Sequence, residues 1–441
     1  MKLTCHQRVV VYLVAFKVLY LVTLTCALGT WGNLDFGQYW QVQRRWPSGG
    51  DPTFGSHFGT WDAAHYLYLS EIGYHHDVAS CAFYPLWPML VRWTAPLAGG
   101  SHLIAGLVLS NLFSLAAWAI FYQRVRQRWG PSVAGRALVF LVVFPGSLFF
   151  QFLYSESLFF LLVMLLWWGL EERRWGLAWG AALLLPLTRA VGVFAVLPIG
   201  WEALQVAPPG WFVRLEAWGA GLWGELGRRG WRTEDGDAEA RGQKSGEKQG
   251  STESRPTGTA VGSAAASPYQ ETGGASPYRV WRLLAAPLIG WGVYLALMWH
   301  WTGHPFEGFA AQKHWGVHSI WNLVNVPKFI LGIFQATEGH EFIGSLLDRC
   351  VGIGLICCLP LVWRLDKGLL IWMYWLGILP AMSGTFTSLT RYVSCAFPVF
   401  IALAAWVRRP ELHWLRWELL IAGAVLHIIL VWRFVNFRWA G

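Results

Sequence analysis

Residues 9–28 read VVVYLVAFKVLYLVTLTCAL, an apolar stretch of the length that a helix needs to cross a lipid bilayer. Similar apolar runs recur along the 441-residue chain, of which 55% is hydrophobic and only 13% is charged. Soluble domains carry about 25% charged residues. The deficit of charge and the repeated apolar runs predict an all-α, polytopic integral membrane protein. The 31 tryptophans fit a protein with many membrane–water interfaces, where indole rings gather.

The charge of the chain bears on topology rather than on a nucleic-acid partner. The formal net charge is +9. In a polytopic membrane protein, lysine and arginine accumulate in cytoplasmic loops and fix the orientation of the spans. We therefore expect the lipid bilayer, and no nucleic acid, as a partner. The seven cysteines lie mostly in or beside apolar runs without zinc-ligand spacing, so we interpret them as core residues.

Apolar length and the distribution of basic residues predict about eleven transmembrane helices. The predicted cytoplasmic turns carry basic pairs, such as Arg173-Arg174 and Arg408-Arg409. The predicted spans are Val9–Leu28, Leu103–Tyr122, Ala137–Phe152, Glu156–Leu170, Leu177–Leu187, Val191–Leu204, Trp281–Trp301, Phe342–Trp363, Leu369–Ser383, Tyr392–Val407 and Leu419–Arg433.

The segment AFYPLWPMLVRWTAPL at residues 82–97 looks like a further span, but it is short and contains three prolines. If it crossed the membrane, Arg124, Arg126 and Arg128 would fall on the non-cytoplasmic side, against the positive-inside rule. We therefore predict that it is a juxtamembrane helix. Residues 29–101 then form one long first loop on the non-cytoplasmic face.

The composition divides the chain into three parts. We expect an N-terminal transmembrane module over residues 1–205 and a C-terminal transmembrane module over residues 281–441. Between them, residues 206–280 are rich in glycine, serine, alanine and mixed charges. Such a segment cannot bury enough apolar surface to offset chain entropy, so we predict a disordered cytoplasmic insert. Its first part, residues 211–231, has apolar residues near helical spacing and fits an interfacial helix.

Within the first loop, residues 59–74 read GTWDAAHYLYLSEIGY, which is too short and too polar to cross a membrane. The aromatic content predicts a short helix resting on the membrane surface. Asp62 has two compatible interpretations. It fits a helix start with Thr60 as N-cap, and it also fits a general base held at the bilayer surface. Three neighbours are candidate substrate contacts: Trp61, His65 and Tyr66.

Other polar residues, far apart in sequence, fall on the same predicted side of the membrane. Tyr154 and Glu156 flank Ser155, which also fits as the cap of the following span. Arg189 and Arg391 interrupt apolar stretches. An arginine at membrane depth needs a partner, and a phosphate is suited to it, although snorkelling is the other explanation. Two further candidates lie on this side: Gln312 and Tyr392.

Several ordered sequence blocks resemble one family of membrane enzymes. The blocks are WDA at 61–63, EIGY at 71–74, FYPLWP at 83–88, SN at 110–111, FP at 144–145, YSESLF at 154–159, TR at 188–189, LP at 379–380, RY at 391–392 and FP at 397–398. Together they span most of the chain outside the insert. The chain resembles the GPI mannosyltransferase 2 (PIG-V) family, including its bacterial relatives, within the GT-C fold of integral membrane glycosyltransferases.

The resemblance implies an inverting enzyme that moves mannose from a polyprenyl phosphate mannose, such as dolichyl phosphate mannose, to a glycolipid or glycan on the non-cytoplasmic face. The eukaryotic member adds the second mannose of the GPI glycan by an α-1,6 linkage. Asp62 matches the family's acid in the first loop and is the candidate catalytic base. On chemical grounds, Arg189 and Arg391 would bind the donor phosphate. The substrate-binding candidates are Trp61, His65, Tyr66, Tyr154, Glu156, Gln312 and Tyr392.

The compartment and the metal requirement stay open at this point. The short outer loop at residues 302–327 is more similar to bacterial relatives, so both a bacterial inner membrane and an endoplasmic reticulum membrane fit. GT-C sites work with or without a divalent metal, and no other cofactor is implied. The run HHD at residues 75–77 has no third ligand at a recognised spacing, so we interpret it as a solvated loop.

Two other classes of protein compete with an enzyme. A transporter or flippase of a lipid-linked or polar substrate would more often show inverted repeats and charged or broken helices near the midplane. We find no repeat among the predicted spans, and the polar residues collect at one face. A catalytically inactive scaffold is the third interpretation, against which the presence of Asp62 argues.

Overall fold

A computed structural model of the chain describes residues 5–32, 37, 39, 51–206, 278–315, 339–340, 345–381 and 388–441. These residues form helices and loops without any strand, which confirms the all-α prediction for this part of the chain. The chain divides into two compact units, Met1–Glu202 with Val280–Gly441, and Ala203–Arg279. The predicted insert falls in the second unit and lies almost wholly outside the described residues, so everything below concerns the first unit.

Five of the described helices are long and apolar enough to cross a membrane. They are Gln7–Trp31, His102–Val143, Val280–Thr302, Leu346–Leu365 and Pro410–Val435. Shorter apolar helices cover Trp175–Thr188, Ala190–Val206, Lys367–Ala381 and Phe397–Trp406. The described part of the chain is therefore that of a helical membrane protein, and it does not confirm the predicted number of about eleven spans.

Proline and glycine explain where the predicted spans differ from the helices. The helix α5 (His102–Val143) bends at Gly130, whose φ of 84° is followed by Pro131. The predicted span Ala137–Phe152 is wrong at its end, because Pro145 opens the 3₁₀ turn η4 (Pro145–Phe150). The predicted span Tyr392–Val407 is also wrong as one helix. It consists of α18 (Leu389–Val393) and α19 (Phe397–Trp406), which begins with a proline in its first turn.

The remaining elements follow the chain in a simple order. They are α1 (Cys5–Trp31), η1 (Phe54–His57), α3 (Asp62–Glu71), η2 (Ala79–Ala82), α4 (Leu86–Thr94), η3 (Ala95–Ala98), α6 (Glu156–Glu171), α7 (Trp175–Thr188), η5 (Ala190–Ala195), α8 (Val196–Val206), α11 (Tyr278–Leu283), α12 (Ala285–Thr302), α13 (Glu307–Ala310), η6 (Ala311–Trp315), α15 (Leu346–Leu365), α16 (Lys367–Met373), the π turn η9 (Tyr374–Ile378), α17 (Leu379–Ala381), η10 (Pro410–Leu412) and α20 (His413–Val435).

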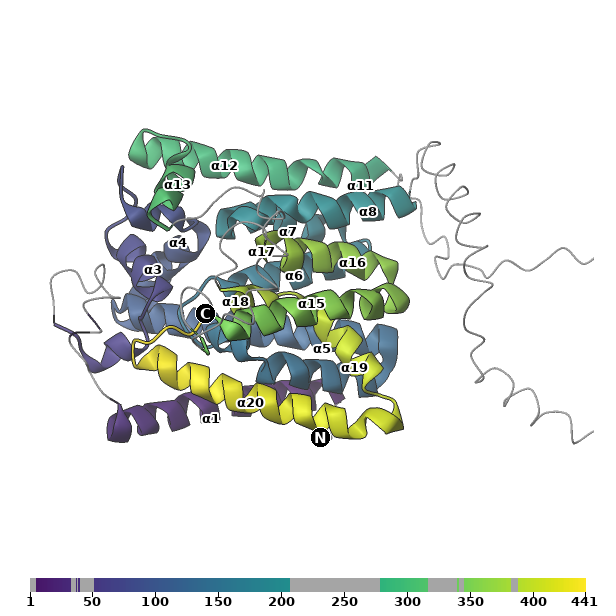
Figure 1. Ribbon diagram of the computed structural model, residues 1–441. Helices are drawn as coiled ribbons and strands as arrows, with labels where there is room; N and C mark the ends of the chain where they lie inside the picture. Colours follow the sequence, from purple (N-terminus) through teal and green to yellow (C-terminus); the bar gives the residue numbers. More distant parts are fainter. Residues whose placement is uncertain are drawn as a thin grey trace, which may run out of the picture. The chain divides into compact units, whose positions relative to one another are not determined.

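Short helices collect at one end of the long ones. Figure 1 shows α3, α4 and α13 at the left end of the helices, which we call the site end because α3 begins with Asp62. The helix α4 has nine residues, about 14 Å, and is too short to cross a membrane. The segment at residues 82–97 therefore does not span, as predicted. The buried helix α6 packs against α5 and α7 and runs about 22 Å from Glu156 at the site end to Glu171 at the opposite end.

Candidate active site

Asp62 is the first residue of α3, and the residue before it has a strained backbone. Trp61 occupies the N-cap position with φ 56° and ψ −126°, a conformation that costs a non-glycine residue about 1–3 kcal/mol. Its indole Nε1 donates to the carbonyl of Arg438 at 3.1 Å, and its ring packs edge-on against Trp439. The prediction of Thr60 as N-cap is wrong, because Thr60 Oγ1 is buried without a hydrogen-bond partner in the described part of the chain.

Four charged side chains from four separate segments meet beside Asp62. Arg391 of α18 donates through Nη1 to Asp62 Oδ2 and through Nε to Glu156 Oε1. Arg189, which follows α7, donates through Nη1 to the same Glu156 oxygen. We call Asp62, Glu156, Arg189 and Arg391 the four-charge network. The two arginines that the sequence suggested for phosphate are thus neighbours, and each of them also has a carboxylate partner.

Burial differs across the four-charge network. The Glu156 side chain is 1% exposed and that of Arg391 7%, whereas Asp62 is 19% exposed and Arg189 14%. A buried ion is tolerated when it is paired, and removing one partner typically costs about 3–5 kcal/mol. Glu156 also begins α6, where the helix dipole favours a carboxylate. Glu156 is therefore the interior anchor, and Asp62 is the acid that faces outward.

Some hydrogen-bond donors and acceptors of the four-charge network have no partner among the described residues. Asp62 Oδ1 makes no hydrogen bond to the described residues, since Arg391 engages Oδ2. Each guanidinium carries five N–H donors. Arg189 uses only Nη1, and Arg391 uses Nη1 and Nε, for their bonds within the described structure. The site thus presents one open carboxylate oxygen beside unused guanidinium donors.

Arg391 is held in position by an acid on another helix. Asp348 Oδ1 accepts hydrogen bonds from both the backbone nitrogen and the hydroxyl of Thr390, each at 2.7 Å. On the other side, Gly146 of η4 faces the Thr390 carbonyl so closely that a Cβ would lie 2.0 Å from its oxygen. Asp348 is buried at 2% exposure. These contacts fix the first turn of α18 and hence the arginine that follows Thr390.

Aromatic side chains surround the network. The Tyr154 hydroxyl accepts from the Asp62 backbone nitrogen at 3.2 Å, and its ring lies 4.9 Å from the Arg391 guanidinium. Burial is the main reason that the pKa of Tyr154 is raised well above its usual value, so this hydroxyl stays protonated. Tyr66 donates to Ser155 Oγ at 2.8 Å. Tyr392 lies between both arginines, with guanidinium carbons 5.2 and 5.9 Å from its ring centroid.

Two predicted residues lie apart from the network. His65 bonds through Nδ1 to Ser80 Oγ at 2.8 Å and stacks on Phe83. Gln312 donates to the carbonyl of Ala82 at 3.4 Å. The structure therefore brings eight of the ten predicted residues together, Asp62 included, and leaves His65 and Gln312 in packing and loop contacts. The eight are Trp61, Asp62, Tyr66, Tyr154, Glu156, Arg189, Arg391 and Tyr392.

Two buried ions within predicted spans, Lys17 and Asp348, were not predicted from the sequence. Asp348 lies in the span Phe342–Trp363, and Lys17 lies in the first span. Lys17 Nζ donates to Gln151 Oε1 at 2.8 Å and to Asn111 Oδ1 at 3.2 Å, and sits 4.3 Å from the Trp118 ring centroid. Its signal was present in the sequence, since an ionisable residue within a span is usually functional or paired. Lys17 ties α1 to α5 and to the loop that leads to Tyr154.

Residues 51–215 match the family model described as Mannosyltransferase (PIG-V). Over this segment, which is less than half of the chain, the sequence is similar to the PIG-V mannosyltransferase family. The segment contains Asp62, Glu156 and Arg189, while Arg391 lies beyond it. Over 151 residues the chain is 29% identical to GPI alpha-1,6-mannosyltransferase 2 of Rattus norvegicus, a match that covers 32% of this chain and 30% of that protein. No solved structure matches the chain.

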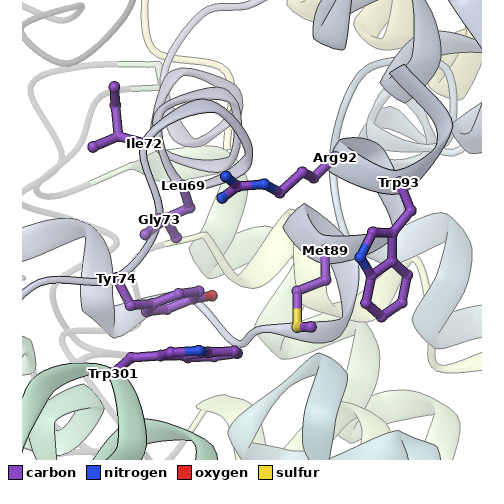
Figure 2. Close-up of a pocket in the computed structure, with 8 residues that line it drawn as sticks. All are labelled: Leu69, Ile72, Gly73, Tyr74, Met89, Arg92, Trp93 and Trp301. Carbon is purple, nitrogen blue, oxygen red and sulfur yellow. The ribbon is translucent and has the colours of Figure 1, made fainter. Parts of the chain in front are cut away.

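A cavity of about 340 Å³ opens at the far end of α3 from Asp62, lined by residues of the PIG-V segment and by Trp301 of α12. Figure 2 shows the stacked rings of Tyr74 and Trp301, 5.0 Å apart, with Met89 and Trp93 beside them and Arg92 extending toward Gly73. Arg92 is exposed and makes no hydrogen bond or ion pair with the described residues. The cavity thus combines an aromatic wall with one unpaired cation.

The HHD run at residues 75–77 contacts α13 and η6. His76 Nδ1 bonds to Glu307 Oε2 at 2.8 Å, and Lys313 pairs with Asp77 at 2.8 Å. Because Lys313 donates to it, the pKa of the exposed Asp77 carboxyl is lowered below its usual value. The side chains of His76 and Asp77 are 60% and 62% exposed, as expected for a solvated loop. Across the described ranges, no three His, Cys, Asp or Glu side chains gather as metal ligands would.

Proposed function

We propose that the chain is an inverting membrane mannosyltransferase. Its donor would be a polyprenyl phosphate mannose, such as dolichyl phosphate mannose, and its acceptor a glycolipid or glycan on the non-cytoplasmic face. The observation that carries the proposal is the four-charge network, whose open carboxylate oxygen lies beside unused guanidinium donors, within and next to the segment matched by the PIG-V family. The name of the rat relative supports mannose as the transferred sugar and a GPI glycan as one acceptor.

Asp62 is the base in this proposal. Its Oδ1 would take the proton of an acceptor hydroxyl while the hydroxyl oxygen attacks C1 of the mannose. The bond from C1 to the phosphate oxygen breaks on the opposite face, so a β-linked donor yields an α-mannoside. Glu156 is the other carboxylate of the network, but it is 1% exposed and is engaged by both arginines through one oxygen. Asp62 is more exposed and has an oxygen without a hydrogen-bond partner among the described residues, so it is the better candidate for the base.

The arginines would stabilise the leaving lipid phosphate. The network has two carboxylates and two guanidinium groups, so its formal charge is zero while Asp62 is ionised. When Asp62 takes up the acceptor proton, the network gains one positive charge. The phosphate gains negative charge in the same step, and preorganised donors aimed at that charge lower the barrier. Proton transfer and phosphate departure would thus support each other electrostatically.

The cavity at the end of α3 favours a glycolipid over a free glycan as acceptor. A donor phosphate is joined to C1 through a single oxygen, so it belongs beside Asp62. The cavity lies near Ile72, about 15 Å along α3 from Asp62. That distance suits an acceptor whose lipid phosphate contacts Arg92 while a short glycan reaches along α3. Replacing Arg92 by glutamine is then expected to raise the KM for the glycolipid acceptor and to leave the KM for the mannose donor unchanged.

The membrane arrangement is part of the same proposal. Basic residues lie at the end of the helices opposite Asp62, which by the positive-inside rule would face the cytoplasm. They include Arg124, Arg126, Arg128, Arg173, Arg174, Arg364, Lys367, Arg408 and Arg409. With the shorter apolar helices and α6 counted as spans, and α5 counted as two spans on either side of Gly130, about eleven crossings would put Asp62 on the non-cytoplasmic face of a bacterial inner membrane or an endoplasmic reticulum membrane.

The test is transfer of labelled mannose from polyprenyl phosphate mannose in membranes that contain the chain. We expect Asp62→Asn to reduce transfer about 10²–10⁴-fold at equal abundance, because an amide cannot accept the proton. Asp77→Asn is the matched control, since it removes an exposed acid from the same loop, and it should retain wild-type transfer. Equal transfer by the Asp62 variant and wild type would reject Asp62 as base. No transfer by the wild type across a panel of acceptors would favour a transporter or a scaffold.

A further inference from the structure

A second cavity lies far from the four-charge network, between the ends of α15 and α19. It has a volume of about 210 Å³. The helix α15 holds Thr390 through Asp348 at the site end, and Arg364 lies 16 residues further along it, about 24 Å away. The cavity is therefore at the opposite end from Asp62. Neither the proposed donor phosphate nor the reacting sugar can reach it from there.

Two unpaired cations line this cavity. Arg364 of α15 and Arg409, which follows α19, are both exposed. Neither makes a hydrogen bond through its side chain or an ion pair within the described structure, and the exposed Glu411 near Arg409 forms no ion pair with it. Asp366, the acid at the end of α15, forms an ion pair with Arg128. The positive charge of the cavity is thus not neutralised by the described residues.

Three other arginines at this end are paired. Arg124 pairs with Glu171 and Glu172, Arg128 with Glu171 and Asp366, and Arg174 with Glu172. Other exposed arginines here, such as Arg126 and Arg408, also lack a carboxylate partner among the described residues, but only Arg364 and Arg409 line the cavity. Arginine guanidinium groups bind phosphate through paired N–H donors. The charge of the cavity suits a phosphate-bearing ligand.

The wall of the cavity is apolar. Leu361 and Leu365 of α15 face Ala402, Ala405 and Trp406 of α19. A ligand that satisfies both features has an anionic phosphate joined to a hydrocarbon chain. Basic pockets between transmembrane helices at the cytoplasmic side are the sites where anionic lipid headgroups bind. Indole rings such as that of Trp406 also settle at the level of the headgroups.

We propose that this cavity binds the headgroup of an anionic phospholipid from the bilayer leaflet at the end opposite Asp62. The phosphate contacts Arg364 and Arg409, and the first part of one acyl chain lies against Leu361 and Ala402. The lipid then bridges α15 and α19. Since α15 also carries Asp348, which holds Thr390 beside Arg391, the bound lipid stabilises the helix pair that supports the four-charge network.

The test uses the purified full chain in nanodiscs of phosphatidylcholine, with and without phosphatidylglycerol. Native mass spectrometry counts the bound phosphatidylglycerol, and thermal unfolding measures its stabilising effect. We expect the double variant Arg364→Gln/Arg409→Gln to bind phosphatidylglycerol roughly thirtyfold more weakly. Each arginine near an anionic lipid surface strengthens binding about five- to sixfold, and the two losses multiply. Its unfolding temperature in pure phosphatidylcholine should equal that of the wild type, which shows that it folds.

The matched control is Arg126→Gln/Arg408→Gln. It removes the same charge from exposed positions at the same end, and neither residue lines the cavity. The control should retain the bound lipid and the rise in unfolding temperature. If both double variants lose lipid equally, general attraction to a charged surface explains the binding and the proposal is wrong. If the cavity variant retains the lipid, it is also wrong. Neither readout depends on mannose transfer.

Discussion

The two ends of α6 carry the same kinds of charge in different surroundings. At the site end, Glu156 binds Arg189 and Arg391, and its side chain is 1% exposed. At the opposite end, Glu171 binds Arg128 at 2.9 Å and is 22% exposed. Solvent screens the second set, whereas the first depends on mutual pairing for its ionisation. One helix thus joins a buried polar cluster to a partly exposed one.

The two ends of α6 also differ in how many hydrogen-bonding atoms have no partner among the described residues. The opposite-end acids are shared among several arginines, and Arg128 reaches both Glu171 and Asp366. At the site end, Asp62 keeps one oxygen open, and Arg189 keeps unused donors, within the described structure. The comparison suggests that the opposite-end cluster joins helices, while the four-charge network is arranged to take a ligand.

Among these substitutions, Glu156→Gln should lower the free energy of unfolding the most. It leaves Arg189 and Arg391 without their shared buried carboxylate, so we expect the free energy of unfolding to fall by about 3–5 kcal/mol. Unfolding in a denaturant series, followed by tryptophan fluorescence, measures the change. If the free energy of unfolding falls by less than about 1 kcal/mol, the burial of Glu156 does not make its ion pairs more important for stability than those of Glu171.

Asp348→Ala should have the next largest effect. It removes the acceptor of two hydrogen bonds from Thr390, and hydrogen bonds to a charged group contribute about 1.5–3 kcal/mol each. We expect lower stability together with a reduced turnover number for mannose transfer, because Arg391 loses its fixed position. Asp348→Asn keeps an acceptor oxygen and should recover most of the turnover. If asparagine is as harmful as alanine, the charge rather than the geometry of Asp348 matters.

Glu171→Gln should have a smaller effect than its counterpart at the site end. Its partners are partly exposed and keep other acids, since Arg128 retains Asp366. We therefore expect the free energy of unfolding to change by about 1 kcal/mol or less, with mannose transfer unaltered. The same denaturant series measures it beside Glu156→Gln. A larger loss than that of Glu156→Gln would reverse the comparison.

The smallest effect concerns the exposed pair Asp77 and Lys313. Their contact lowers the pKa of Asp77 below its usual 3.8. A depressed pKa contributes stability that is present above the unfolded value and is lost as the pH falls through the folded value. Lys313→Gln should therefore lower the free energy of unfolding slightly at neutral pH, where Asp77 is ionised, and shift the Asp77 titration, followed by carboxyl NMR, back toward 3.8. No shift would mean that the pair does not persist in solution.

Sequence predicted the local features of the site and not its pairing. The short helix at Asp62, and a helix within residues 82–97 that is too short to cross a membrane, followed from length, polarity and the positive-inside rule. The ion pair between Asp62 and Arg391 joins residues 329 positions apart, which no local pattern encodes. The number of spans was least predictable, because Gly130 and Pro145 end or bend helices inside continuous apolar runs.

Lys17 has a consequence for how the chain enters the membrane. It lies near the middle of the first apolar helix, where a lysine raises the free energy of insertion by about 2.5–3.5 kcal/mol. Its partners Asn111 and Gln151 follow 94 and 134 residues later. During synthesis, the first helix must therefore pass through a stage in which its ammonium group has neither partner. The two hydrogen bonds of Lys17 can therefore both form only after the chain has been synthesised past residue 151.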